Sequence, residues 1–201
     1  MIAPCYFIDV DTQNDFMSKE GLEPIPGASE IRHNLMLLTS HAVKKAHPII
    51  APVELYDKHL PGCLKLPLHC RCGSKGFEKI TETRVKKMAV IPMSPARISY
   101  KEFLKKYHQI ILEKYAYNAF NNPHFLKLLK AGRLKNCVVY GVGLDYGIES
   151  LVLRLMKEGF KVFMPVDAVK PINEENREMT LVELRKYGAE MWNTEFIIKN
   201  T

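Results

Sequence analysis

The chain alternates between short apolar runs and longer stretches with helical periodicity. Residues 5–10 (CYFIDV) and 136–142 (NCVVYGV) are almost continuously apolar, which is typical of strands buried on both faces. Residues 28–46 instead repeat apolar side chains every three to four positions, as an amphipathic helix does. Such alternation predicts parallel strands joined by right-handed crossovers, with helices on both faces of the sheet.

The same pattern continues to the end of the chain. The predicted strands occupy residues 5–10, 47–55, 87–92, 109–114, 136–142 and 161–166. The predicted helices occupy residues 28–46, 100–108, 122–132, 146–158 and 174–187. We therefore predict a three-layer α/β/α fold around a mostly parallel, doubly wound, six-stranded sheet, formed by a single domain over residues 1–201.

The composition of the chain indicates where the protein is found in the cell and excludes several classes of protein. At 201 residues with 47% hydrophobic and 25% charged residues, the chain can bury a substantial core. It has no apolar run long enough for a membrane span and no basic leader at its start, so we expect a cytoplasmic protein. The net charge of +7 comes from scattered basic residues without interleaved aromatics, which favours a solvated basic surface over nucleic-acid binding.

Three polar features follow predicted strands. Asp11 comes directly after the first strand, Lys114 ends another, and residues 141–150 (GVGLDYGIES) turn from a strand into a helix. Ligands bind at the carboxyl ends of the strands in such folds, so the three features indicate a site with an acid or base, a cation and helix N–H donors. Each also has an ordinary interpretation: a turn aspartate, a solvated lysine and a βα turn whose glycines serve geometry.

The segment 56–84 reads as a long loop rich in proline, glycine, cysteine and histidine, and loops of this length are usually functional. Asp57, His59 and His69 offer the carboxylate and imidazole ligands that suit zinc, iron or manganese. A structural zinc site built on the cysteines of this loop is the alternative. Its candidate thiolates are Cys63, Cys70 and Cys72.

Taken together, these motifs resemble the nicotinamidase/isochorismatase superfamily, the cysteine hydrolases. The resemblance rests on DTQNDF, YDKHLPG, LPLHCRCGSKG, EKYAYNAFNNP, VVYGVGLDYGIES and GFKVFMPVDAV, which occur in the family's order. It implies an isochorismatase-like fold, a small-molecule substrate and a homo-oligomer. It also implies a catalytic Asp11 and Lys114 and a metal bound by Asp57, His59 and His69.

The resemblance further implies a substrate pocket and a nucleophile position. The pocket would be lined by Phe16, Val142, Gly143 and Tyr146, with a cis peptide between Val142 and Gly143. In the family a cysteine attacks an amide and forms a thioester, but Gly147 occupies that position here, so no thioester can form there. Two smaller departures are Lys65, where a further histidine is usual, and Leu66, where an aromatic is usual.

Three interpretations stay open at this point. The first is a hydrolase that needs no thiol, as in isochorismatases, which resemble this chain in carrying glycine at the nucleophile position and use the aspartate as a general acid. The second is a catalytically inactive, nicotinamidase-like protein that binds a small ligand or a partner. The third is a cysteine replaced by design.

Overall fold

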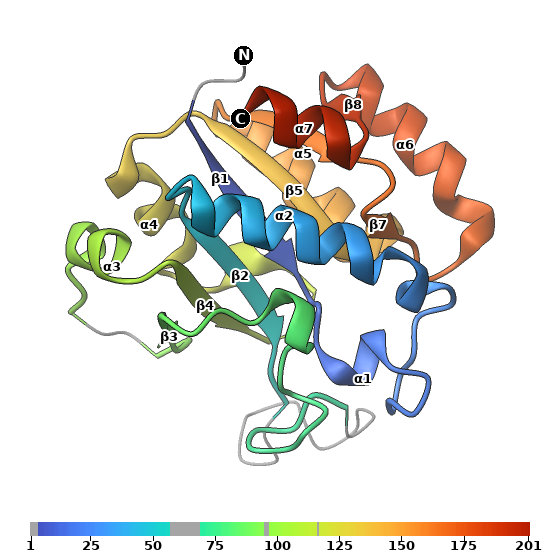
Figure 1. The fold of residues 1–201 in the computed structure, drawn as a ribbon, viewed down its shortest axis with the longest axis horizontal. Helices are drawn as coiled ribbons and strands as arrows, with labels where there is room; N and C mark the ends of the chain where they lie inside the picture. Colours follow the sequence, from blue (N-terminus) through green and yellow to red (C-terminus); the bar gives the residue numbers. More distant parts are fainter. Residues whose placement is uncertain (1–3, 57–68, 95–96, 116) are drawn as a thin grey trace.

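One parallel sheet organises the molecule. The computed structural model describes residues 4–56, 69–94, 97–115 and 117–201. Within these residues, eight strands form one sheet in the order β3-β4-β2-β1-β5-β6-β8, and β7 pairs with β5 (Figure 1). Every one of these strand pairs is parallel.

The element bounds follow the predicted ones closely. The strands are β1 (Cys5–Val10), β2 (Ile49–Glu54), β3 (Met88–Ile91), β4 (Gln109–Lys114), β5 (Asn136–Val142), β6 (Lys161–Pro165), β7 (Val169–Lys170) and β8 (Glu190–Trp192). The helices are α1 (Asn14–Met17), α2 (Arg32–Lys44), α3 (Tyr100–Lys106), α4 (Phe125–Gly132), α5 (Glu149–Lys157), α6 (Arg177–Lys186) and α7 (Thr194–Asn200).

The order of the strands reverses beside β1. From β1 the chain forms β2, then the edge strand β3, and then β4 between them, and it next crosses to the other side of β1 to form β5, β6 and β8. Such a reversal leaves a crevice at the carboxyl ends of the two central strands, because their connections leave in opposite directions. The place where the topology forms a crevice is therefore the end of β1 and β5.

Helices cover both faces of the sheet. Helices α2 and α7 lie over one face and α4 and α5 over the other (Figure 1). All residues of β1, β2 and β5 are buried, which explains why their sequences are apolar without alternation. The predicted three-layer α/β/α fold with a mostly parallel sheet is confirmed.

The number of strands differs from the prediction of six. The two additional strands, β7 and β8, have two and three residues, which is too short for a hydrophobic period to show in the sequence. In the part of the chain that the structure describes, no helix is both long and apolar enough to span a membrane.

Candidate active site

Four neighbouring strands deliver the polar groups of the candidate site. Lys114 ends β4, Glu54 ends β2, Asp11 follows β1, and a turn that contains Gly147 follows β5. Because β4, β2, β1 and β5 lie side by side and run parallel, these four positions meet at one edge of the sheet. The structure thus brings together the three features that the sequence predicted, and it adds Glu54.

Asp11 is held in a strained conformation by its neighbours. Its φ of 52° lies in the left-handed region, which is uncommon for a residue with a side chain. Its backbone N–H donates to the carbonyl of Pro52 at 3.1 Å, and its Oδ1 accepts the backbone N–H of Glu54 at 3.1 Å. These bonds fix the carboxyl group against the end of β2.

Lys114 lies between two carboxylates. Its side chain is fully buried, with Nζ 2.9 Å from Oδ2 of Asp11 and 3.3 Å from Oε1 of Glu54. Glu54 and Lys114 are also direct partners in the register of β2 and β4. The register therefore places both side chains on the same face of the sheet, so the contact follows from strand pairing.

Burial and charge shift the titration of all three groups. Burial raises the pKa of Asp11; the ammonium of Lys114 opposes this shift and the charge of Glu54 adds to it. Burial alone would lower the pKa of Lys114, but the charges of Asp11 and Glu54 raise it overall. Burial likewise opposes ionisation of Glu54, yet Lys114 and His69 hold its pKa below the usual value. Of the two carboxyl groups, Asp11 is thus the one that retains its proton to unusually high pH.

His69 extends this set of charges towards the surface. Its Nε2 lies 3.2 Å from Oε2 of Glu54, and its Nδ1 lies 2.6 Å from Oε2 of Glu23. The imidazole also contacts two aromatic rings, with centroids at 5.4 Å for Phe16 and 4.5 Å for Tyr56. Burial lowers the pKa of His69, but the hydrogen bond to Glu54 and the neighbouring carboxylates raise it overall.

One buried carboxylate holds the two segments that carry Glu23 and His69. Asp15 accepts the backbone N–H of Cys70 at 2.6 Å on one oxygen and that of Leu22 at 3.1 Å on the other. Its own backbone carbonyl accepts the N–H of Glu23 at 3.2 Å. Asp15 of the predicted DTQNDF motif is therefore a positioning residue rather than a member of the pocket.

The turn after β5 leaves space beside Asp11. Gly143 adopts a φ of 78°, and residues Leu144–Ile148 form one π-helical turn before α5. The predicted cis peptide at Val142–Gly143 is wrong for this structure, which has no cis bond among its described residues. A Cβ at Gly147 would lie 3.7 Å from Oδ2 of Asp11 and 3.4 Å from the carbonyl of Tyr117, both ordinary contacts.

These residues surround a cavity of about 130 Å³. All four residues predicted to bind substrate line it: Phe16, Val142, Gly143 and Tyr146. Asp11 and Gly147 line it as well, whereas Lys114 lies behind Asp11 and Glu54. Sequence reasoning missed six further lining residues: Glu23, Ile25, Glu54, Tyr56, Tyr117 and Ile172.

The missed residues differ in how they could have been found. Glu54 ends an apolar strand, and a carboxylate at that point was a signal of the same kind as Asp11. Glu23 and Tyr117 lie outside regular elements, and no local pattern sets them apart from other surface residues.

A comparison with known families decides the relationship. The family model described as the isochorismatase domain matches residues 5–196. The chain belongs to the isochorismatase family. Over 74 residues it is 34% identical to Nicotinamidase 3 of Arabidopsis thaliana, a stretch that covers 37% of each protein. The chain thus matches little more than a third of that relative's length.

Solved structures share the fold of this isochorismatase-family chain over almost its whole length. Nicotinamidase PncA from Bacillus subtilis superposes with a TM-score of 0.76 at 20% identity, covering 94% of this chain and 98% of that one. A pyrazinamidase of Pyrococcus horikoshii in complex with zinc gives a TM-score of 0.74 at 23% identity, covering 94% and 99%. At these identities the likeness shows a shared fold.

The predicted metal ligands are only partly within the described residues. Asp57 and His59 lie outside them. His69 lies inside, but both of its ring nitrogens face carboxylates, so neither is available to an ion without rearrangement. Among the residues that the structure describes, no group of three or more histidine, cysteine or acidic side chains could hold a metal ion. The described donors therefore do not fit a metal centre in this arrangement.

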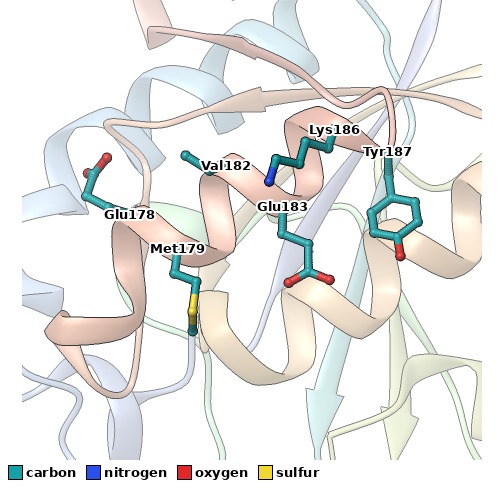
Figure 2. Close-up of a pocket in the computed structure, with 6 residues that line it drawn as sticks. All are labelled: Glu178, Met179, Val182, Glu183, Lys186 and Tyr187. Atoms are coloured by element: carbon teal, nitrogen blue, oxygen red, sulfur yellow. The ribbon is translucent and has the colours of Figure 1, made fainter.

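A larger hollow of about 590 Å³ lies elsewhere on this isochorismatase-family domain. Figure 2 shows that its labelled lining side chains all project from α6 or the residue after it, among them Glu178, Met179 and Tyr187. Its residues belong to a single helical segment, and no buried acid–base pair opens into it. The smaller cavity at the strand ends is the candidate active site.

The buried charges predict a specific stability pattern. Replacing Lys114 by Met should lower the free energy of unfolding by about 3–5 kcal/mol, because two buried carboxylates then lose their cation. Adding Glu54→Gln should recover part of this loss. Urea unfolding measures both effects. Lys199→Met is the control, since Lys199 pairs with Glu195 on the surface and should cost less than about 1 kcal/mol. Equal losses of unfolding free energy in Lys114→Met and Lys199→Met would contradict the assignment of Lys114 as the buried partner of two carboxylates.

Proposed function

We propose that this chain hydrolyses a small molecule by acid–base chemistry at Asp11, with Lys114 as its partner and without a thioester intermediate. The observation that supports this most is the buried contact of 2.9 Å between Asp11 and Lys114 beside Gly147. We equate Gly147 with the position of the nucleophilic cysteine in related hydrolases. Glycine has no nucleophilic atom, so the reacting group must meet Asp11 directly.

The raised pKa of Asp11 fits a general acid. In this proposal its carboxyl group donates a proton to an acid-labile group such as a vinyl ether. The proton goes to a carbon of the C=C bond, which leaves an oxocarbenium ion. Water then adds to the resulting oxocarbenium carbon, and the hemiketal breaks down to a carbonyl compound and an alcohol while a proton returns to Asp11. The ammonium of Lys114 stabilises the carboxylate that exists between the two transfers.

Binding without turnover is the second candidate. It is favoured by the contact between Lys114 and Glu54, because the ammonium then already has a second anionic partner before any substrate arrives. A pocket that keeps its charges paired can hold a ligand without polarising it. The presence or absence of turnover separates the two candidates.

Two expectations from the sequence stay predictions: a cytoplasmic location and a homo-oligomer. The third, a divalent zinc, iron or manganese ion at Asp57, His59 and His69, conflicts with the contacts of His69, and metal analysis tests it below. The reaction proposed above includes no metal step.

Asp11→Asn should lower kcat by at least about a hundredfold on any substrate found in a panel of amides and vinyl ethers. The amide keeps the shape of the side chain but cannot donate the acid proton. In the wild type, the rate should fall as pH rises through the raised pKa of Asp11, because only the protonated form acts. Steady-state rates across pH measure both effects, with Glu178→Gln on the exposed face of α6 as the control. Undiminished turnover in Asp11→Asn would contradict the proposal.

Gly147→Cys should give the site a nucleophile. The contacts of the added Cβ are ordinary and the backbone there is not left-handed, so we expect the variant to fold. With small amides it should form an acyl adduct that intact-mass spectrometry detects. Neither the wild type nor Gly147→Ala should form it, and addition of Asp11→Asn should remove it. A folded Gly147→Cys variant without an adduct on any amide or ester would show that position 147 is not the nucleophile position.

The geometry of His69 predicts a low metal content. Because carboxylates face both of its ring nitrogens, the purified protein should hold less than about a tenth of an equivalent of zinc, iron or manganese. Elemental analysis measures this directly. A full equivalent would mean that His69 exchanges a carboxylate for the ion, as the sequence predicts, and His69→Ala should then remove the metal.

A further inference from the structure

The candidate cavity combines aromatic walls with an excess of carboxylates. On one side Phe16 and Tyr56 contact His69. On the other side the rings of Tyr117 and Tyr146 lie with centroids 4.2 Å apart, and both are partly exposed to solvent. All four aromatic residues line the cavity. Its walls are therefore rich in aromatic rings, whose faces carry partial negative charge.

Among the residues that the structure describes, the charges around the cavity alternate and end in carboxylates. The order is Asp11, Lys114, Glu54, His69 and Glu23, and each cation lies within 3.3 Å of the carboxylates on either side of it. Three acids line the cavity itself, whereas His69 is the basic group among the described lining residues. With His69 protonated, the set of five is neutral overall while Asp11 keeps its proton, and it carries one net negative charge once Asp11 has lost that proton.

No other cation of the adjoining strands offsets this charge. Lys170 of β7 is the register partner of the lining residue Val142, but its Nζ pairs with Glu30 at 2.8 Å. The described lining contains no arginine, the residue that binds carboxylates through two parallel hydrogen bonds. Among the described residues, an anionic ligand would therefore meet cations that are already paired with carboxylates.

We propose that this cavity takes a small organic cation, such as a pyridinium ring or a quaternary ammonium group, and disfavours carboxylate ligands. Aromatic side chains attract such cations through the negative charge on their ring faces, most strongly where water is excluded. Glu23, which is about half exposed at 53% of its side chain, supplies the carboxylate nearest to solvent. The proposal rests on the proposed function only in using the same cavity.

Three probes with the same ring and different charge test this proposal. They are 1-methylnicotinamide (a cation), nicotinamide (neutral) and nicotinate (an anion), each titrated calorimetrically into the full chain at neutral pH. We expect affinity to decrease in that order, with the cation binding at least about tenfold more tightly than the anion. Nicotinate binding as tightly as the cation, or no binding of the cation at all, would overturn the proposal.

Two variants separate the charge from the ring contribution. Glu23→Gln should reduce the preference for the cation over nicotinate several-fold, whereas Glu20→Gln on the same exposed segment should leave it unchanged. Tyr146→Leu should weaken binding of the cation more than that of nicotinate. Equal preference in the Glu23 and Glu20 variants would assign the selectivity to the overall charge of the protein and contradict the proposed site.

These binding measurements are independent of turnover. Cation-selective binding without turnover would remove the hydrolase proposal and leave this one. Turnover of anionic substrates with no binding preference for the cation would remove the cation-site proposal and leave the hydrolase proposal.

Discussion

The buried ammonium of Lys114 is the group on which the site depends. It has no contact with solvent, so the cost of removing its charge from water must be offset by Asp11 and Glu54. Those two carboxylates come from the neighbouring strands, and Glu54 is the direct register partner of Lys114. The charges therefore meet only when β4, β2 and β1 lie in this order and register. A change of register by one residue would turn Lys114 to the other face and leave a buried charge without partners.

A second buried pair supports the same strand ends. Lys79 donates to Asp9 and to Thr12, both at 2.6 Å, and Thr12 also bonds to Asp9. This network fixes the chain on both sides of Asp11, which keeps its left-handed backbone conformation. Strain of this kind persists only where surrounding contacts determine the geometry. The position of the Asp11 carboxyl group is therefore set by hydrogen bonds that themselves take no part in ligand binding.

The sequence predicts the fold well because buried parallel strands leave a continuous apolar signal. Asp11, Lys114 and the turn to Gly147 were found for a related reason, since each follows such a strand. Glu54 was missed although it also ends a strand, because its role depends on pairing with Lys114 across the sheet. Hydrophobic periodicity gives the faces of a strand but not its neighbour or register. The partners of His69 were unpredictable for the same reason, since Glu23 reaches it from a segment without regular structure.

Gly147 changes what a raised pKa at Asp11 can do. A thiol at this position would lie beside Oδ2 of Asp11, and the carboxylate would then take up the proton of the nucleophile. Without that side chain, the carboxyl group borders the cavity directly, held by Lys114 and the backbone N–H of Glu54. Burial still raises the pKa of Asp11, so this residue keeps its proton to a higher pH than an exposed aspartate does when a ligand binds. In the proposed reaction Asp11 thus donates a proton, whereas beside a thiol it would accept one, and Lys114 stabilises its carboxylate in both cases.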